Sequence, residues 1–205
     1  MDKYEYNSTL KVLYTSKKKE PFFVDVPLMG YLTFQGSGHP NEEDFQKSCK
    51  ALYTISYMIK FEIVRKQLEI DYKVNPMEVT WLLDKSKGAT SFTWTMMIMQ
   101  PNFITEDMFE SAIQIAKEKG KEIEYERIAF EMIDFGKCIQ CFHLGDYNLM
   151  NDTLAKMKTF AELNNITCDL YTHDIYLNDM RKTKMENYKT IMRVKSYQNL
   201  LSAHS

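Results

Sequence analysis

The sequence predicts an α+β protein, built as two strand-helix-strand-strand modules in a pseudo-two-fold arrangement. Strand-like and helix-like segments follow one another in the same order twice along the chain. Two pairs of matching residues, Asp25 with Asp134 and Gly36 with Gly145, are each separated by 109 positions. Hydrophobic residues make up 44% of the 205 residues, enough for a large core. We expect an antiparallel sheet with helices on one face and a ligand cleft on the other.

The whole chain, 1–205, is expected to form a single domain, with module one at about 20–120 and module two at about 125–196. In module one, β-forming residues predict a bent strand over 22–36, interrupted by Pro27 and Gly30. The spacing of apolar residues then predicts a long helix from Asn41 to about Leu68. Further expected elements are a strand over 76–83, a turn over 84–88, a strand over 91–99 and a helix that Thr105 begins and Gly120 ends.

Module two repeats this order. We expect a strand over 127–144, a helix over about 152–163, and strands near 169–177 and 188–195. Because side chains alternate along a strand, Glu78 and Trp81 are predicted to point to opposite faces unless a bulge intervenes.

Composition excludes several classes of protein. A net charge of -2 and a pI near 6.1 give no basic surface for nucleic acid. No run of residues reaches the roughly 20 apolar positions of a membrane span, and no early stretch reads as a signal peptide. These features predict a cytoplasmic protein with no nucleic-acid or membrane partner, either a monomer or a homodimer. The four cysteines are then expected to be reduced thiols.

The two modules each carry an acid on a corresponding strand. The segment Met77-Glu78-Val79-Thr80 matches His173-Asp174-Ile175-Tyr176 in kind, so a pseudo-two-fold axis would bring Glu78 and Asp174 to facing positions. A pair of carboxylates among aromatic rings suits a ligand site or an acid/base site. Acids on strands mostly face solvent, and it is the repeat that favours a function here. The rings of Trp94, Tyr147 and Tyr176 could stack on planar or cationic ligands.

Other motifs give weaker signals. Cys138 and Cys141 have the spacing of a redox or metal motif, but on one strand they would point to opposite faces, which favours core packing. His143 and His173 also lie on strands, and metal ligation by them is the less favoured alternative. No glycine-rich phosphate loop and no nucleophile elbow occurs. We expect no metal and no cofactor.

Six ordered motifs resemble the GyrI-like small-molecule-binding proteins, over nearly the whole chain. They are Val24-Asp25-Val26-Pro27, Gly36-Ser37-Gly38-His39-Pro40-Asn41, Ala51-Leu52-Tyr53, Met99-Gln100-Pro101-Asn102-Phe103, His143-Leu144-Gly145-Asp146-Tyr147 and His173-Asp174-Ile175-Tyr176-Leu177-Asn178-Asp179. The resemblance implies two modules with a cleft between them. Relatives include ligand-binding domains of multidrug-responsive regulators, in which an acid and aromatics receive lipophilic cations, and hydrolases that open strained cyclopropane rings.

Three positions depart from the family pattern. Asp174 stands where Glu is usual, Leu82 where a second Trp is common, and Met180 where Pro is common. A shorter acid and a missing ring favour binding over hydrolysis.

The first functional hypothesis is therefore a protein that sequesters or detoxifies hydrophobic small molecules, cationic or electrophilic. Its ligand-binding residues are Glu78, Trp81, Trp94, Tyr147, Asp174 and Tyr176. The alternative is a hydrolase that opens strained rings of cyclopropanoid electrophiles, with Glu78, Asp174 and Tyr176 as catalytic candidates. A weaker alternative is a protein that interacts with gyrase.

Overall fold

The computed structural model describes residues 1–39, 42–83, 92–169 and 171–198, and it confirms a mixed α+β fold. The chain folds into two compact units, each assembled from two stretches of sequence. Unit 1 contains Met1–Asn7 and Met29–Ile133, and unit 2 contains Ser8–Leu28 and Asp134–Ser205. The start of the predicted long helix at Asn41 and the predicted turn over 84–88 lie outside the described residues.

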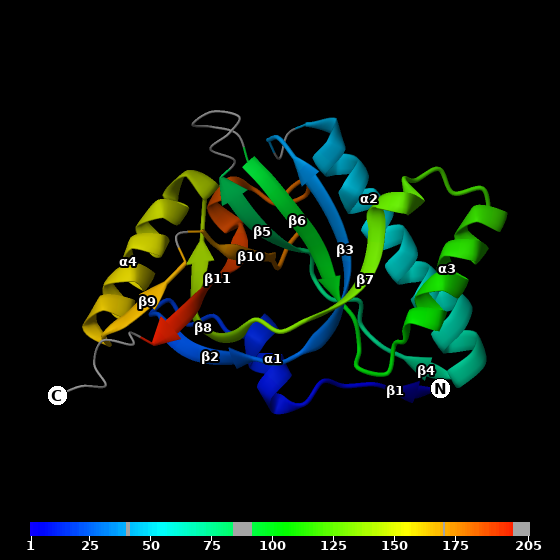
Figure 1. Ribbon diagram of the computed structural model, residues 1–205, viewed down its shortest axis with the longest axis horizontal. Helices are drawn as coiled ribbons and strands as arrows, with labels where there is room; N and C mark the ends of the chain where they lie inside the picture. Colours follow the sequence, from blue (N-terminus) through cyan, green and yellow to red (C-terminus); the bar gives the residue numbers. More distant parts are fainter. Residues whose placement is uncertain (40–41, 84–91, 170, 199–205) are drawn as a thin grey trace. The chain divides into compact units, whose positions relative to one another are not determined.

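Unit 1 contains an antiparallel sheet in the order β5-β6-β3-β7 (Figure 1). Its elements along the chain are β1 (Asp2–Lys3), β3 (Met29–Ser37), α2 (Glu43–Met58), η1 (Ile59–Leu68), β4 (Ile70–Asp71), β5 (Glu78–Leu83), β6 (Phe92–Met99), α3 (Glu106–Glu118), η2 (Tyr125–Arg127) and β7 (Ile128–Ile133). The short strand β1 pairs in parallel with β4.

Helices α2 and α3 cover one face of this sheet. On α2, Phe45, Ser48 and Leu52 are buried at helical spacing, and Ser48 donates a hydrogen bond to the Met96 sulfur of β6 (3.4 Å). On α3, the ring of Phe109 stacks on that of Phe130 of β7. The face that bears Trp94, Met96 and Ile98 is therefore the helix side of unit 1.

The predicted helix boundaries are partly confirmed. Thr105 caps α3 by accepting a hydrogen bond from the backbone N–H of Met108, and Gly120 follows the helix with φ of +63°, a conformation that glycine adopts without strain. The predicted long helix is continuous from Glu43 to Leu68, but its second half, η1, is a π-helix.

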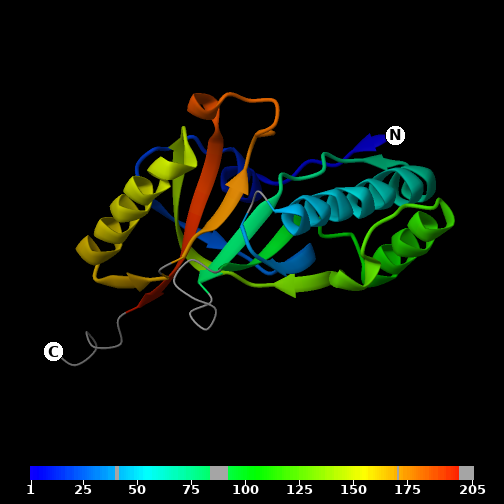
Figure 2. The ribbon, with the colours of Figure 1, turned by 90° about the horizontal axis from the view of Figure 1, so that it is seen from above.

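Unit 2 contains an antiparallel sheet in the order β2-β8-β11-β10, with β9 on the remaining part of β11. Its elements are α1 (Ser8–Thr15), β2 (Phe22–Val26), β8 (Gly136–Leu144), η3 (Tyr147–Leu149), α4 (Met150–Leu163), β9 (Ile166–Cys168), β10 (His173–Tyr176), η4 (Met185–Asn187) and β11 (Lys189–Gln198). Figure 2 shows α4 running beside the strands of this unit.

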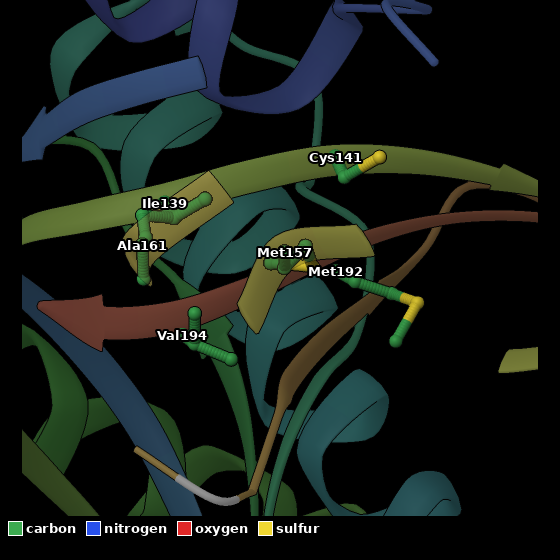
Figure 3. Close-up of a cluster of buried hydrophobic side chains, with 6 residues drawn as sticks. All are labelled: Ile139, Cys141, Met157, Ala161, Met192 and Val194. Carbon is green, nitrogen blue, oxygen red and sulfur yellow. The ribbon is translucent and has the colours of Figure 1, made fainter. Parts of the chain in front are cut away.

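A hydrophobic cluster joins α4 to its sheet. It contains Ile139 and Cys141 of β8, Met157 and Ala161 of α4, and Met192 and Val194 of β11 (Figure 3). The opposite face of the sheet carries Gln140 and Arg193, whose side chains bond to backbone carbonyls at the end of α1. Both faces of this sheet are therefore packed.

Two strands that the sequence predicts as single elements are each divided between the units. The predicted strand 22–36 breaks at Pro27, so that β2 pairs with β8 in unit 2 while β3 belongs to unit 1. The predicted strand 127–144 breaks before Gly136, which has φ of +62° and donates its backbone N–H to Asp134 (2.9 Å). Here β7 pairs with β3 in unit 1 and β8 lies in unit 2.

The strand before each break therefore belongs to one compact unit and the strand after it to the other. The predicted modules, about 20–120 and 125–196, follow sequence order, whereas the compact units do not. The single domain and the pseudo-two-fold arrangement stay predictions.

Candidate functional site

Four side chains of unit 2 form what we call the Asp174–tyrosine cluster: Asp174, Tyr147, Tyr176 and Tyr188. Tyr147 begins η3, directly after Asp146, which caps this turn by accepting from the N–H of Asn148 (3.0 Å). Its ring stacks on Tyr188 (5.1 Å between centroids) and meets Tyr176 edge to face (5.9 Å). The cluster therefore brings together three of the predicted site residues.

Asp174 lies on the same face of the sheet as these rings. It pairs with Met192 across β10 and β11, and Met192 belongs to the cluster under α4. Tyr176, two residues on, shares that face. The Asp174 side chain is only 4% exposed. The carboxyl group of Asp174 is therefore largely removed from bulk water.

The loop after β10 covers part of the cluster. Asn178 holds this loop by donating to the carbonyl of Asn187 (2.8 Å) and accepting from the N–H of Lys189 (3.1 Å). The hydroxyl of Tyr147 donates to the sulfur of Met180, and that of Tyr188 donates to the Met180 carbonyl (3.3 Å). Met180 thus lies over the hydroxyl ends of two tyrosines.

Burial raises the pKa of Tyr147, and the charges of Tyr188 and Asp174 raise it further, while a hydrogen bond with Thr190 acts in the opposite direction. The neutral phenol is therefore retained in the folded protein. The stabilisation that comes from the raised pKa of Tyr147 is fully present below the ordinary tyrosine pKa of about 10. It is lost as the pH rises from there towards the pKa of Tyr147 in the folded protein.

We expect Asp174→Asn to lower the pKa of Tyr147 but to leave it above that of an ordinary tyrosine. Removing the carboxylate removes one cause of the shift, whereas burial, the largest cause, remains. NMR titration of protein labelled at the tyrosine Cζ would measure the change, with Tyr147→Phe to assign the signal. An unchanged pKa would contradict the closeness of Asp174 to this phenol.

Glu78 lies in unit 1, at the start of β5, where it pairs with Met97 of β6. The continuous register from Glu78–Met97 to Leu83–Phe92 shows no bulge, so the predicted alternation along β5 is confirmed. Glu78 is fully buried and lies on the face away from α2. Leu82 shares that face but is 58% exposed.

The structure does not bring Trp81 and Trp94 to the face of Glu78. These two residues are direct cross-strand partners, and both rings pack on Phe45 of α2, at 5.8 and 5.2 Å between centroids. They therefore belong to the helix side of the sheet. We predicted that these rings lie beside an acid in a common ligand cleft. In unit 1 they do not lie beside Glu78, because its side chain points to the other face of β5.

The two acids differ in the side on which they lie relative to the helix that packs on their own unit. Glu78 points away from α2, the helix of its own unit that packs on Trp94, whereas Asp174 points to the side covered by α4. A shift of one residue in register moves a side chain to the other face. Segments 77–80 and 173–176 match in kind, but their acids have different parities relative to α2 and α4.

Two residues near Glu78 were missed by the sequence reasoning. Tyr6 and the buried Asn75 are hydrogen-bonded to each other (2.6 Å), and the charge of Glu78 contributes to the raised pKa of Tyr6, after burial and Tyr4. They are distant in sequence, and no local pattern predicts their pairing.

Cys138 and Cys141 are buried thiols rather than a reactive pair. Cys138 and Cys141 lie on opposite faces of β8, as predicted, and Cys141 belongs to the cluster under α4. Burial raises the pKa of both thiols to about 11. Within the described parts of the chain, no three His, Cys, Asp or Glu side chains gather as metal ligands would. No helix among the described residues is long and apolar enough to cross a membrane.

Comparisons with known proteins agree with this fold. A crystal structure of an uncharacterized conserved protein from Listeria innocua is 31% identical, with a TM-score of 0.82, over 89% of this chain and 94% of that one. A structure described as a hydrolase from Listeria innocua is 32% identical, with a TM-score of 0.81 and the same coverage. The EcmrR C-terminal domain has the same general fold at 10% identity (TM-score 0.52, 88% of this chain and 98% of that one).

No curated protein matches the chain. The model of one family, described as the GyrI-like small molecule binding domain, matches residues 19–195, which is most of the sequence. This chain therefore belongs to the GyrI-like family of small-molecule-binding domains.

Proposed function

We propose that this protein binds and sequesters hydrophobic cationic small molecules, with the Asp174–tyrosine cluster as the group that contacts them. The observation that carries the proposal is that Asp174, 4% exposed, shares the face of Tyr176, whose ring contacts Tyr147, which in turn stacks on Tyr188. An aromatic face attracts a cation by about 0.5–2 kcal/mol, and more strongly away from water. Membership of a small-molecule-binding family supports the same function.

Charge is the property to test. Benzyltrimethylammonium and its neutral isostere neopentylbenzene have nearly the same shape, so their affinities for one protein differ mainly through the cation. We expect wild type to prefer the cation, and Asp174→Asn to weaken cation binding by about 10- to 100-fold with little effect on the neutral probe, because a buried carboxylate lies near the charge. Titration calorimetry would measure both affinities.

Asp152→Asn is the matched control. Asp152 lies in the first turn of α4 and is exposed, so its replacement makes the same change in net charge without touching the cluster. Equal binding of both probes to wild type, or an equal loss in the two variants, would rule out recognition by Asp174.

A second candidate function is hydrolysis of electrophilic substrates with strained rings. It is favoured by the 32% identity to a protein described as a hydrolase. Asp174 and Tyr176 lie two residues apart on one face and would act as the acid/base pair. Asp174 would take a proton from water as the water oxygen bonds to the ring carbon, and Tyr176 would give a proton to the fragment that receives the electron pair of the broken bond.

Turnover distinguishes the two functions. A hydrolase should lose its rate in Asp174→Asn while keeping much of its affinity, and Glu78→Gln tests the remaining acid candidate in the same way. A wild-type protein that binds a cyclopropanoid electrophile and releases it unchanged would exclude hydrolysis and leave sequestration.

A further inference from the structure

The loop between β10 and β11 contacts the tyrosines of unit 2 through Met180. This loop, residues 177–188, joins two neighbouring strands of the sheet and is orange in Figure 2. The Met180 sulfur accepts from the hydroxyl of Tyr147, and the Met180 carbonyl accepts from the hydroxyl of Tyr188 (3.3 Å). Because both acceptors belong to one residue, a displacement of Met180 changes the hydrogen bonds of both phenols.

A second set of hydrogen bonds holds the base of the loop. The backbone N–H of Leu177 donates to the carbonyl of Lys189 (2.9 Å), and the N–H of Lys189 donates to the side-chain oxygen of Asn178 (3.1 Å). Asn178 also donates to the carbonyl of Asn187 (2.8 Å). The loop is therefore attached at two places, its base and Met180, and an opening of the whole loop must break both attachments.

The sulfur of Met180 is within reach of small molecules from solvent. Met180 is half-buried, whereas Met157 and Met192 of the same unit are 0% and 1% exposed. Met185, in η4 of the same loop, is 57% exposed. A small oxidant such as hydrogen peroxide therefore has access to the two methionines of the loop, while the two beneath α4 are shielded from it.

Oxidation of the thioether would end the hydrogen bond from Tyr147. A lone pair of the Met180 sulfur bonds to one oxygen of hydrogen peroxide, the O–O bond breaks, and the other oxygen leaves as water after taking up the proton. Methionine is oxidised to its sulfoxide and the peroxide is reduced to water. The sulfur is then positively polarised and no longer accepts the phenol proton. Its new oxygen is strongly polar and favours water over the surroundings of aromatic rings.

We propose that Met180 is a site of reversible oxidation, at which a hydroperoxide forms the sulfoxide and thereby detaches the 177–188 loop from Tyr147 and Tyr188. The thioether keeps the loop over the two hydroxyls, and the sulfoxide releases it. Sulfoxide reductases return methionine sulfoxide to the thioether, so the change can be reversed. The inference concerns the loop itself and does not depend on the function proposed for the Asp174–tyrosine cluster.

Peptide mass spectrometry after mild treatment with hydrogen peroxide shows where oxygen is added. We expect sulfoxide at Met180 and Met185, while Met157 and Met192 stay unmodified, because only the first two are open to solvent among these four. Oxidation of Met157 or Met192 before Met180 would overturn the proposal, since the reagent would then be acting on unfolded protein.

Hydrogen–deuterium exchange measures the release of the loop. We expect the backbone N–H groups of Leu177 and Lys189 to exchange about tenfold faster in the oxidised protein, because an opening of the loop no longer has to break the bonds to Met180. The N–H of Val194, farther along β11, should exchange at an unchanged rate. Treatment with a methionine sulfoxide reductase should restore the slow exchange.

Two variants assign the effect to one sulfur. Met180→Leu cannot be oxidised at this position, so peroxide should leave its exchange rates as they were before treatment. Met185→Leu is the matched control, because Met185 lies in the same loop but the two tyrosines donate to Met180. In this control, peroxide should speed the exchange of the loop as it does in wild type.

The pKa of Tyr147 is an independent readout of the same event. Burial is the largest cause of its rise, so release of the loop should lower this pKa in an NMR titration of the tyrosine Cζ. The proposal is overturned if Met180 stays reduced while Met185 is oxidised, if the sulfoxide leaves the exchange rates or the pKa unchanged, or if Met180→Leu responds to peroxide as wild type does. None of these results affects the cation preference expected of the reduced protein.

Discussion

Arg193→Ala is expected to lower the free energy of unfolding by about 3–5 kcal/mol. Arg193 lies in the middle of β11 and is fully buried. Its Nε donates to the side-chain oxygen of Gln140 (2.8 Å), its Nη2 donates to the carbonyl of Leu13, and its guanidinium lies over the ring of Tyr14 (5.1 Å). The variant would leave both acceptors without this donor and would leave a void beneath the end of α1.

Two further variants separate charge and hydrogen bonding from simple loss of volume. Arg193→Met refills most of the void but cannot donate a hydrogen bond. Its free energy of unfolding should therefore lie between that of wild type and that of Arg193→Ala. Lys195→Ala changes a partly exposed cation two residues away on the same face, and it should cost about 0.5 kcal/mol or less. Urea unfolding followed by circular dichroism measures all three. A loss below about 1 kcal/mol for Arg193→Ala would contradict a structural role for the buried guanidinium.

The features of the fold that the sequence predicts correctly depend on short stretches of chain. The helix cap at Thr105 and the helix end at Gly120 can be predicted from a few adjacent residues. The alternation of side chains along β5 can be predicted from its six residues. Propensity and periodicity are local properties, so a single sequence contains enough information for them. The class of the fold follows from the order of such elements.

The pairing of strands is not local, and here prediction failed. Nothing near Pro27 or Gly136 indicates that the strands on either side of each residue belong to different compact units. The comparison of Glu78 with Asp174 depends on residue type alone. Two segments can still match in residue type when one is shifted by a single position. The same shift moves every side chain to the opposite face of the strand.

In the candidate site, too, local features were predicted and contacts between distant segments were not. Asp174 and Tyr176 were predicted from one short motif, and they do lie on one face of β10. Tyr188 comes from a segment distant from Tyr147, and only the tertiary structure shows that their rings stack. Sequence reasoning therefore found the acids but only some of their neighbours.

Gly36→Ala is expected to destabilise the protein by about 1–3 kcal/mol, although alanine is ordinarily better than glycine in a strand. Gly36 of β3 is the direct cross-strand partner of Trp94. A Cβ atom at this position would overlap two ring carbons of Trp94 and would lie 2.8 Å from Oδ2 of Asp44. Neither neighbour can yield easily, because Trp94 is buried against Phe45 and Asp44 is held by two hydrogen bonds from Arg127.

A double-mutant cycle tests this cause. Trp94→Phe alone should also destabilise, because it leaves a void, but the added methyl group of Gly36→Ala can occupy part of the vacated space. The double variant should therefore be more stable than the sum of the single effects by about 1 kcal/mol or more. Gly36→Ala combined with Phe109→Leu, which alters the distant contact with Phe130, should be additive. If Trp94→Phe is also additive with Gly36→Ala, then the glycine is not required for the close approach of the tryptophan ring.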